Sequence, residues 1–154
     1  MASYSFADVM ATLVAPAGNI TLAGDTSGAV ADEGISIEKA EDRNTMMVGC
    51  QGEIMHCKHA AVNGVIRIRL LKTSPNNGKL MNLMNSLDGD MWGVGQFSIR
   101  DRVRGDVISA AEVAFTGPPT LVYGKLAGIQ EWTFHAGFMS AMLYAGSPIF
   151  GGDR

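Results

Sequence analysis

Short runs of alternating apolar and polar residues recur along this chain and predict β-strands more often than helices. The clearest run places Ile66, Ile68 and Leu70 on one face and Arg67 and Arg69 on the other. A period of two residues is typical of a strand, because successive side chains point to opposite faces of the sheet. We expect the aliphatic face of this strand to enter the core and the arginine face to meet water or a partner.

Alternation predicts strands in most of the remaining chain as well. The first is expected at residues 4–14, with a turn at 15–19 and a short strand at 20–22 completing a hairpin. Residues 53–62 fit no single pattern. Further strands are expected at residues 35–38, 44–48, 97–103, 107–115, 120–123 and 129–138.

Two of the later strands have a well-defined expected orientation. In residues 97–103 the outward side chains include Arg100 and Arg102, and a tight turn at Gly105-Asp106 follows. The inward side chains of this strand are expected to be Phe97, Ile99 and Val103. In residues 129–138, one face is expected to carry Trp132, Phe134, Ala136 and Phe138.

One segment has the period of an α-helix. Ser74 is a suitable cap and Pro75 suits the first helical position. A stripe of Leu80, Leu83, Met84 and Leu87 follows at the spacing i, i+3, i+4, i+7, and Asp88-Gly89 ends the pattern. We expect a helix at about residues 75–88 whose stripe packs into the core.

Composition agrees with one mainly β domain over residues 1–154. The chain has 154 residues, of which 47% are apolar and 18% charged, and it contains 19 glycines, which suit many turns. Eight or nine short strands and one helix predict a small β-barrel or sandwich with a flanking helix. The low charged share also predicts that part of the surface is buried against partners.

Charge is unevenly distributed along the chain. Residues 1–49 carry seven acids and two bases, a net charge of −5, whereas residues 50–125 carry six acids and nine bases, a net charge of +3. Such a split arises on an ordinary solvated surface, but it also suits a head-to-tail contact between copies. We therefore expect the acidic loop at about residues 24–43 to contact a neighbouring subunit.

Four side chains invite a metal-site interpretation, which the spacing does not favour. Cys50, His56, Cys57 and His59 are a ligand set that zinc accepts. The chain has no C-x2-C motif, and in an extended segment His56 points away from Cys57 and His59. We therefore predict neither a metal nor another cofactor, and no catalytic constellation.

The sequence offers no targeting or membrane segment. The first basic residue is Lys39, so the N-terminal region lacks the basic start of a secretory signal. No run of 18 apolar residues exists that could span a bilayer. We expect a protein that is made and assembled inside a cell, with no membrane insertion by this chain.

Several motifs nevertheless resemble a known family. They are Tyr4-Ser5-Phe6-Ala7-Asp8-Val9, Ala40-Glu41-Asp42-Arg43-Asn44-Thr45-Met46, Leu70-Leu71-Lys72-Thr73-Ser74-Pro75, Arg104-Gly105-Asp106-Val107-Ile108 and Glu131-Trp132-Thr133-Phe134. In their number and order, from the N-terminus to about residue 140, they resemble the inner tail tube proteins of contractile-tailed bacteriophages.

The resemblance implies a structural virion protein and not an enzyme. Such proteins form rings, of six subunits in this family, that stack into a hollow tube through which DNA passes. The implied partners are further copies of the chain, the tail sheath, the tape-measure protein, and the baseplate and tail terminator proteins. The implied location is the phage tail, assembled in the cytoplasm of the bacterial host.

Three alternatives stay open at this point. The chain is also compatible with the tube of a phage-tail-like bacteriocin, with a terminator or baseplate ring, and with a small ligand-binding β-barrel. In the tube, we expect the arginines to meet acids of adjacent subunits or to lie toward the sheath, and not to line the channel unpaired. The expected inter-subunit contacts are Asp25, Asp32, Glu33, Glu38, Glu41, Asp42, Arg67, Arg69, Arg100 and Arg102.

Overall fold

A computed structural model describes residues 4–16, 18–23, 30–86, 93–126 and 128–143, with residues 30–33 described by their backbone alone. Among these residues, seven strands form one antiparallel sheet in the order β2-β1-β7-β8-β9-β6-β3. These strands are β1 (Val9–Ala15), β2 (Gly18–Ala23), β3 (Val30–Lys39), β6 (Gly64–Leu71), β7 (Gly95–Asp101), β8 (Val107–Phe115) and β9 (Ile129–Met142).

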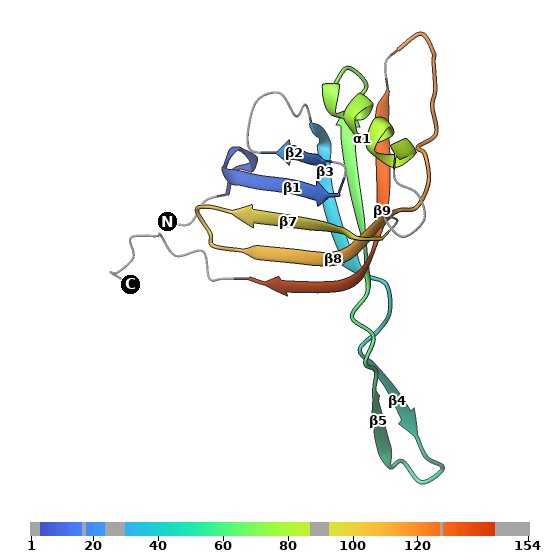
Figure 1. The fold of residues 1–154 in the computed structure, drawn as a ribbon. Coiled ribbons are helices and arrows are strands. Elements are labelled where there is room, and N and C mark those ends of the chain that lie inside the picture. Colours follow the sequence, from blue (N-terminus) through green and yellow to red (C-terminus); the bar gives the residue numbers. More distant parts are fainter. Residues whose placement is uncertain (1–3, 17, 24–29, 87–92, 127, 144–154) are drawn as a thin grey trace, which may run out of the picture.

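The sheet is strongly curved, so that its strands change direction from one edge to the other (Figure 1). In Figure 1, β1, β7 and β8 cross the view, whereas β3 and β6 run steeply upward behind them, and β9 bends from one direction into the other. Because β2 and β3 remain at two separate edges, the architecture is a half-barrel and not a closed barrel. The expected mainly β class with one flanking helix is confirmed.

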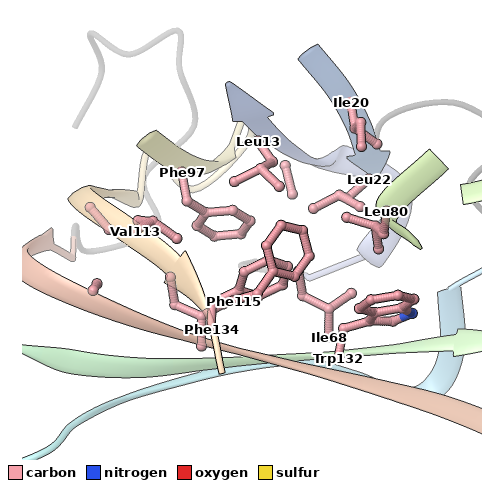
Figure 2. Packing of buried hydrophobic residues seen from close by; sticks show 14 of the residues in the cluster. Leu13, Ile20, Leu22, Ile68, Leu80, Phe97, Val113, Phe115, Trp132 and Phe134 are labelled. Carbon is pink, nitrogen blue, oxygen red and sulfur yellow. The ribbon is translucent and has the colours of Figure 1, made fainter. Parts of the chain in front are cut away.

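One cluster of buried side chains fills the space that the curled sheet encloses (Figure 2). The expected inward face of β6 is confirmed, since Ile66, Ile68 and Leu70 are fully buried. The ring of Phe115 on β8 lies 4.8 Å from that of Phe134 on β9, centre to centre. The same cluster contains Leu13 of β1, Leu22 of β2 and Ile68 of β6, so strands from both halves of the curled sheet share one core.

The helix α1 (Pro75–Ser86) closes one end of this core. The hydroxyl of Ser74 accepts the N–H of Asn76 at 3.2 Å, which confirms the expected cap. Leu80 and Leu83 are buried and Met84 packs against the cluster. The remainder of the expected stripe and its end, residues 87–89, lie outside the described part of the chain.

Amide side chains attach α1 to the sheet. Asn77 accepts a hydrogen bond from the indole N–H of Trp132 at 3.0 Å and donates to the carbonyl of Leu71 at 2.9 Å. Asn76, 2% exposed, donates to the carbonyl of Thr21 at 3.1 Å. These bonds join the helix to three strands and satisfy groups that burial would otherwise leave without a partner.

Phe138 was expected on the inward face of β9, but a bend in β8 and β9 leaves it exposed. Glu112 has a φ of 55° and is an extra residue in β8 relative to β7. A Cβ on Gly137 would lie 3.1 Å from Glu112 Cβ, so glycine permits this close approach. Beyond the bend the buried face of β9 changes phase, and Met139 is buried whereas Phe138 is 50% exposed.

The acidic segment at residues 24–43 is mostly strand where the structure describes it. Expected as a loop with a short strand at 35–38, it instead forms β3 over Val30–Lys39, which pairs with β6. Asp32 and Glu33 therefore lie in an edge strand, whose register shifts near Gly34, at a φ of 68°. Asp25 lies outside the described residues.

Three other strand predictions need correction. The expected first strand begins later, at Val9, because residues Phe6–Asp8 form a 3₁₀ turn, η1, capped by Ser5. Residues 120–123 are irregular and exposed, and no described strand pairs with them. The strand at 97–103 ends at Asp101, whose carboxylate accepts backbone N–H groups in the following turn, so Val103 lies outside the strand.

Candidate interaction surfaces

A two-stranded hairpin projects away from the body of the molecule (Figure 1). It consists of β4 (Asn44–Val48) and β5 (Ile54–Lys58), paired in antiparallel register and separate from the main sheet. Its strands carry large apolar side chains that are more than half exposed: Met46 54%, Met47 54%, Val48 61%, Ile54 59% and Met55 55%. This part of the surface is apolar where an ordinary exposed hairpin is polar.

Apolar groups occupy both faces of the hairpin. Met47 lies opposite Met55 on one face, and Val48 lies opposite Ile54 on the other. A two-stranded hairpin without further cover is only marginally stable in water, since neither face is buried. Flexible methionines are also suited to contacts with irregular surfaces. The hairpin is therefore the strongest candidate for contact with another protein surface.

The four candidate metal ligands all lie on or beside this hairpin. Cys50 is exposed in the connecting turn, and His56 and Cys57 follow each other on β5, on opposite faces. A ring nitrogen of His56 lies 3.1 Å from the Asn44 amide. A ring nitrogen of His59 lies 2.7 Å from the Thr45 hydroxyl. Both imidazoles thus fasten the two strands together, and the described residues hold no group of three or more potential metal ligands.

The main sheet is tightly packed where the chain leaves it for the hairpin. The N–H of Ala40 donates to the carbonyl of Asn63 at 3.2 Å, and the Lys39 ammonium donates to the carbonyl of Met139 at 2.9 Å. A Cβ on Gly64 would lie only 2.3 Å from the Met139 methyl carbon, so a side chain does not fit. These contacts order the end of the main sheet, from which residues 40–43 and 59–63 lead into and out of the hairpin.

The arginine face of β6 is electrically neutralised within one chain. Arg67 pairs with Glu38 of β3, and Arg69 pairs with Glu131 of β9 at 3.0 Å and donates to the Ser36 hydroxyl at 3.2 Å. Glu38 was the expected partner of an arginine from another subunit, whereas the structure pairs it inside the chain. These exposed pairs contribute about 0–1 kcal/mol each to stability and mainly cancel charge.

The other arginines and acids are arranged differently. Arg100 is exposed on β7, which is separated from β6 by the two strands β8 and β9. Arg102 donates to the carbonyls of Ala7 and Asp8 at 3.3 and 3.4 Å and so attaches η1 to the turn after β7. Glu41 and Asp42 are exposed in the connection that enters the hairpin. Their contact with a neighbouring subunit stays a prediction.

One open groove bears on the ligand-binding alternative. Its charged lining includes Asp101, whose carboxylate accepts the N–H groups of Val103 and Arg104 at 3.0 and 3.1 Å. That carboxylate therefore stabilises a turn, which weakens the case for a polar group aimed at a ligand. The apolar lining includes Tyr4, Phe6, Val9, Ile35, Ile99 and Ile108.

No helix among the described residues has the length and apolarity needed to cross a bilayer.

Sequence analysis missed the apolar side chains of the hairpin as a surface. Met46-Met47-Val48 is a run without alternation, which in a strand places apolar groups on both faces. From the sequence alone, the same run is equally compatible with a strand in the core. The separation of β4 and β5 from the main sheet is what identifies these residues as exposed.

Solved structures with a similar fold include a tube-terminating cap and two chains of an extracellular contractile injection system. The fold is similar to the anti-feeding prophage tube-terminating cap, with a TM-score of 0.58 and 9% identity, over 93% of this chain and 94% of that one. It is also similar to a chain of the PVC sheath-tube complex in the extended state, with a TM-score of 0.55 and 12% identity, over 92% of both chains. A third similar structure is the PVC sheath/tube terminator in the extended state, with a TM-score of 0.57 and 12% identity, over 92% of this chain and 98% of that one.

Sequence comparison assigns the family directly. No curated protein sequence matches the chain. A family model described as bacteriophage PhiTE tail tube protein matches residues 1–144 of the 154. The match covers the sheet, the helix and the hairpin alike, and it confirms the resemblance drawn from the motifs. The chain therefore belongs to the bacteriophage PhiTE tail tube protein family, whose members are structural tail proteins and not enzymes.

Proposed function

We propose that this protein polymerises as stacked hexameric rings into the inner tube of a contractile phage tail and so forms the conduit for DNA ejection. The exposed apolar hairpin carries the proposal, because it is a surface that water does not stabilise and a neighbouring copy would cover. The two open sheet edges, β2 and β3, offer unpaired backbone groups for lateral contact within a ring. A repeated head-to-tail contact of this kind builds an open stack.

The proposed partners follow from the tube. They are further copies of the chain, the sheath, the tape-measure protein, and the baseplate and terminator proteins. Support for the sheath and the terminator comes from the similar folds in a sheath-tube complex and a sheath/tube terminator. The proposed location is the phage tail, with assembly in the cytoplasm of the host bacterium. The acidic segment at residues 24–43 is retained as a proposed contact between subunits.

The channel wall is proposed to carry no unpaired arginine face. DNA is a polyanion, and each phosphate neutralised by a free base would add affinity and slow its passage. Arg67 and Arg69 each have a carboxylate partner in the same chain, which supports a wall that does not hold DNA even where β6 faces the channel. The same reasoning directs Arg100 toward an acid of a neighbour or toward the sheath.

A second candidate is a ring that ends the tube. The tube-terminating cap and the sheath/tube terminator match this fold with TM-scores of 0.58 and 0.57. These scores are no lower than the TM-score of 0.55 for the chain of the sheath-tube complex. A terminator forms a ring that does not propagate, because one of its two ends lacks a contact for the next ring. The tube of a phage-tail-like bacteriocin would share every physical feature considered above.

Sedimentation and negative-stain microscopy of the purified full chain, over a series of increasing concentrations, separate these candidates. Long uniform hollow tubes are expected for the tube protein. Rings that never lengthen would support the terminator and overturn the tube. A monomer at every concentration would overturn both.

A further inference from the structure

A second apolar surface lies in the connection between β8 and β9. Within residues 116–126, four large apolar side chains are 49% to 82% exposed. They are Leu121, Val122, Tyr123 and Leu126. We call residues 116–126 the apolar loop. Exposure of this extent over a short segment is unusual for a surface that remains in water.

The apolar loop is held in place by contacts with the end of β6. The ammonium of Lys72 donates to the carbonyl of Val122 at 2.6 Å and lies 3.9 Å from the centre of the Tyr123 ring. At the start of the loop, Pro118 and Pro119 restrict the backbone. A segment fixed in this way loses little conformational freedom when a partner binds, so it is preorganised for contact.

The loop and the hairpin lie at opposite ends of the molecule. In Figure 1 the hairpin projects below the sheet, and the loop between β8 and β9 rises beside α1 at the upper end. Two different apolar surfaces at opposite ends suit a contact that repeats from copy to copy in one direction. An isologous dimer, by contrast, would bring two identical surfaces together.

The two surfaces also match in chemical character. The turn end of the hairpin carries one carboxylate, Glu53, whereas the one base of the hairpin, Lys58, lies at the opposite end of β5, nearest the body. The apolar loop contains one ammonium, Lys125, and no acid, and the second ammonium beside it is Lys72. Apolar side chains therefore meet apolar side chains, while an acid at the hairpin end can approach a base on the loop.

We propose that the apolar loop is the docking surface for the β4–β5 hairpin of a second copy of this chain. The inference rests on the proposed function, since it names the acceptor for the contact that stacks the rings. It also gives the stack a direction, because each copy donates its hairpin at one end and accepts a hairpin at the other.

The native Cys50 at the end of the hairpin allows a direct test. In a Cys57→Ser background, a Leu126→Cys variant carries one thiol on each proposed partner surface, and both positions are exposed. A Ser98→Cys variant, exposed on β7, is the matched control. Assembled particles are treated with a short bis-maleimide, dissolved in detergent and separated under denaturing conditions.

A ladder of covalent multimers is expected for the Leu126→Cys variant and not for the Ser98→Cys control, and an added Cys50→Ser change should abolish it. Particles that form normally but give no ladder, or give one only with the control, would overturn the inference while leaving the tube intact. If no assembly pellets at any concentration, the proposed function fails together with the inference.

Charge exchange gives an independent measurement. Glu53→Lys and Lys125→Glu should each raise the concentration needed for assembly by about two- to fivefold, as expected for loss of an exposed ion pair. The double variant should restore the original concentration, because it re-forms the pair with the signs exchanged. Purely additive effects in the double variant would contradict the proposed contact.

Discussion

Replacing the two methionines on one face of the hairpin should block assembly and leave the fold intact. Met47 and Met55 lie directly opposite each other and are 54% and 55% exposed in the single chain. Burying a whole methionine side chain contributes about 1.5–3 kcal/mol, so covering the exposed half contributes about 0.8–1.5 kcal/mol each. For the pair, the loss on substitution by serine is about 1.5–3 kcal/mol for each contact.

This loss corresponds to a roughly 10- to 150-fold weaker association. The concentration at which the Met47→Ser/Met55→Ser variant begins to assemble should rise by a similar factor, measured by sedimentation and light scattering. Because both side chains are exposed, the free energy of unfolding of the single chain should change by less than about 1 kcal/mol in total.

A matched control removes comparable apolar area elsewhere. Met10 and Val14 on β1 are 40% and 42% exposed, and the Met10→Ser/Val14→Ser variant should assemble near the original concentration. If the hairpin variant assembles as readily as the unmodified chain, the hairpin makes no contact that matters. An equal effect of both variants would show that general surface hydrophobicity, and not this hairpin, drives assembly.

Three substitutions test the internal structure by urea unfolding of the unassembled chain. Gly64→Ala should cost about 1–3 kcal/mol, because the new Cβ would lie 2.3 Å from Met139 Cε and 2.8 Å from a carbonyl oxygen of β3. Asn77→Leu should cost about 1–3 kcal/mol, since it leaves the indole N–H of Trp132 without its acceptor. Leu80→Ala should cost about 2–5 kcal/mol through a cavity in the core. Unchanged unfolding midpoints would contradict these contacts.

Local periodicity was enough to predict the elements that pack against the core. The alternation around Arg67 and Arg69 gave the correct buried face of β6, and Ser74 and Pro75 gave the correct start of α1. In these segments a single buried face decides the conformation, so the sequence pattern and the structure agree.

Periodicity failed where long-range contacts decide the conformation. β8 and β9 bend together where Glu112 lies opposite Gly137, and beyond this bend Phe138 is exposed although its spacing from Trp132 is even. Residues 120–123 have the composition of a strand but find no neighbouring edge, and instead they lie against Lys72.

The candidate interaction surface was the part least accessible to sequence reasoning. The charge split predicts contacts of acids and arginines between subunits, which stay a prediction, and within the single chain Arg67 and Arg69 already pair with carboxylates. The apolar run Met46-Met47-Val48 is equally compatible with a core strand and with a contact surface. Only the position of the hairpin outside the main sheet distinguishes the two, and this is a property of the fold.

The most direct test is a cryo-electron microscopy reconstruction of the assembly formed by the full chain. The account predicts a hollow tube of stacked hexameric rings, in which the hairpin of each subunit lies against the apolar loop of a subunit in the next ring. It also predicts that Arg67 and Arg69 keep their carboxylate partners. Stacked rings with the Met47 and Met55 side chains left in solvent would contradict the central claim that the hairpin joins one ring to the next.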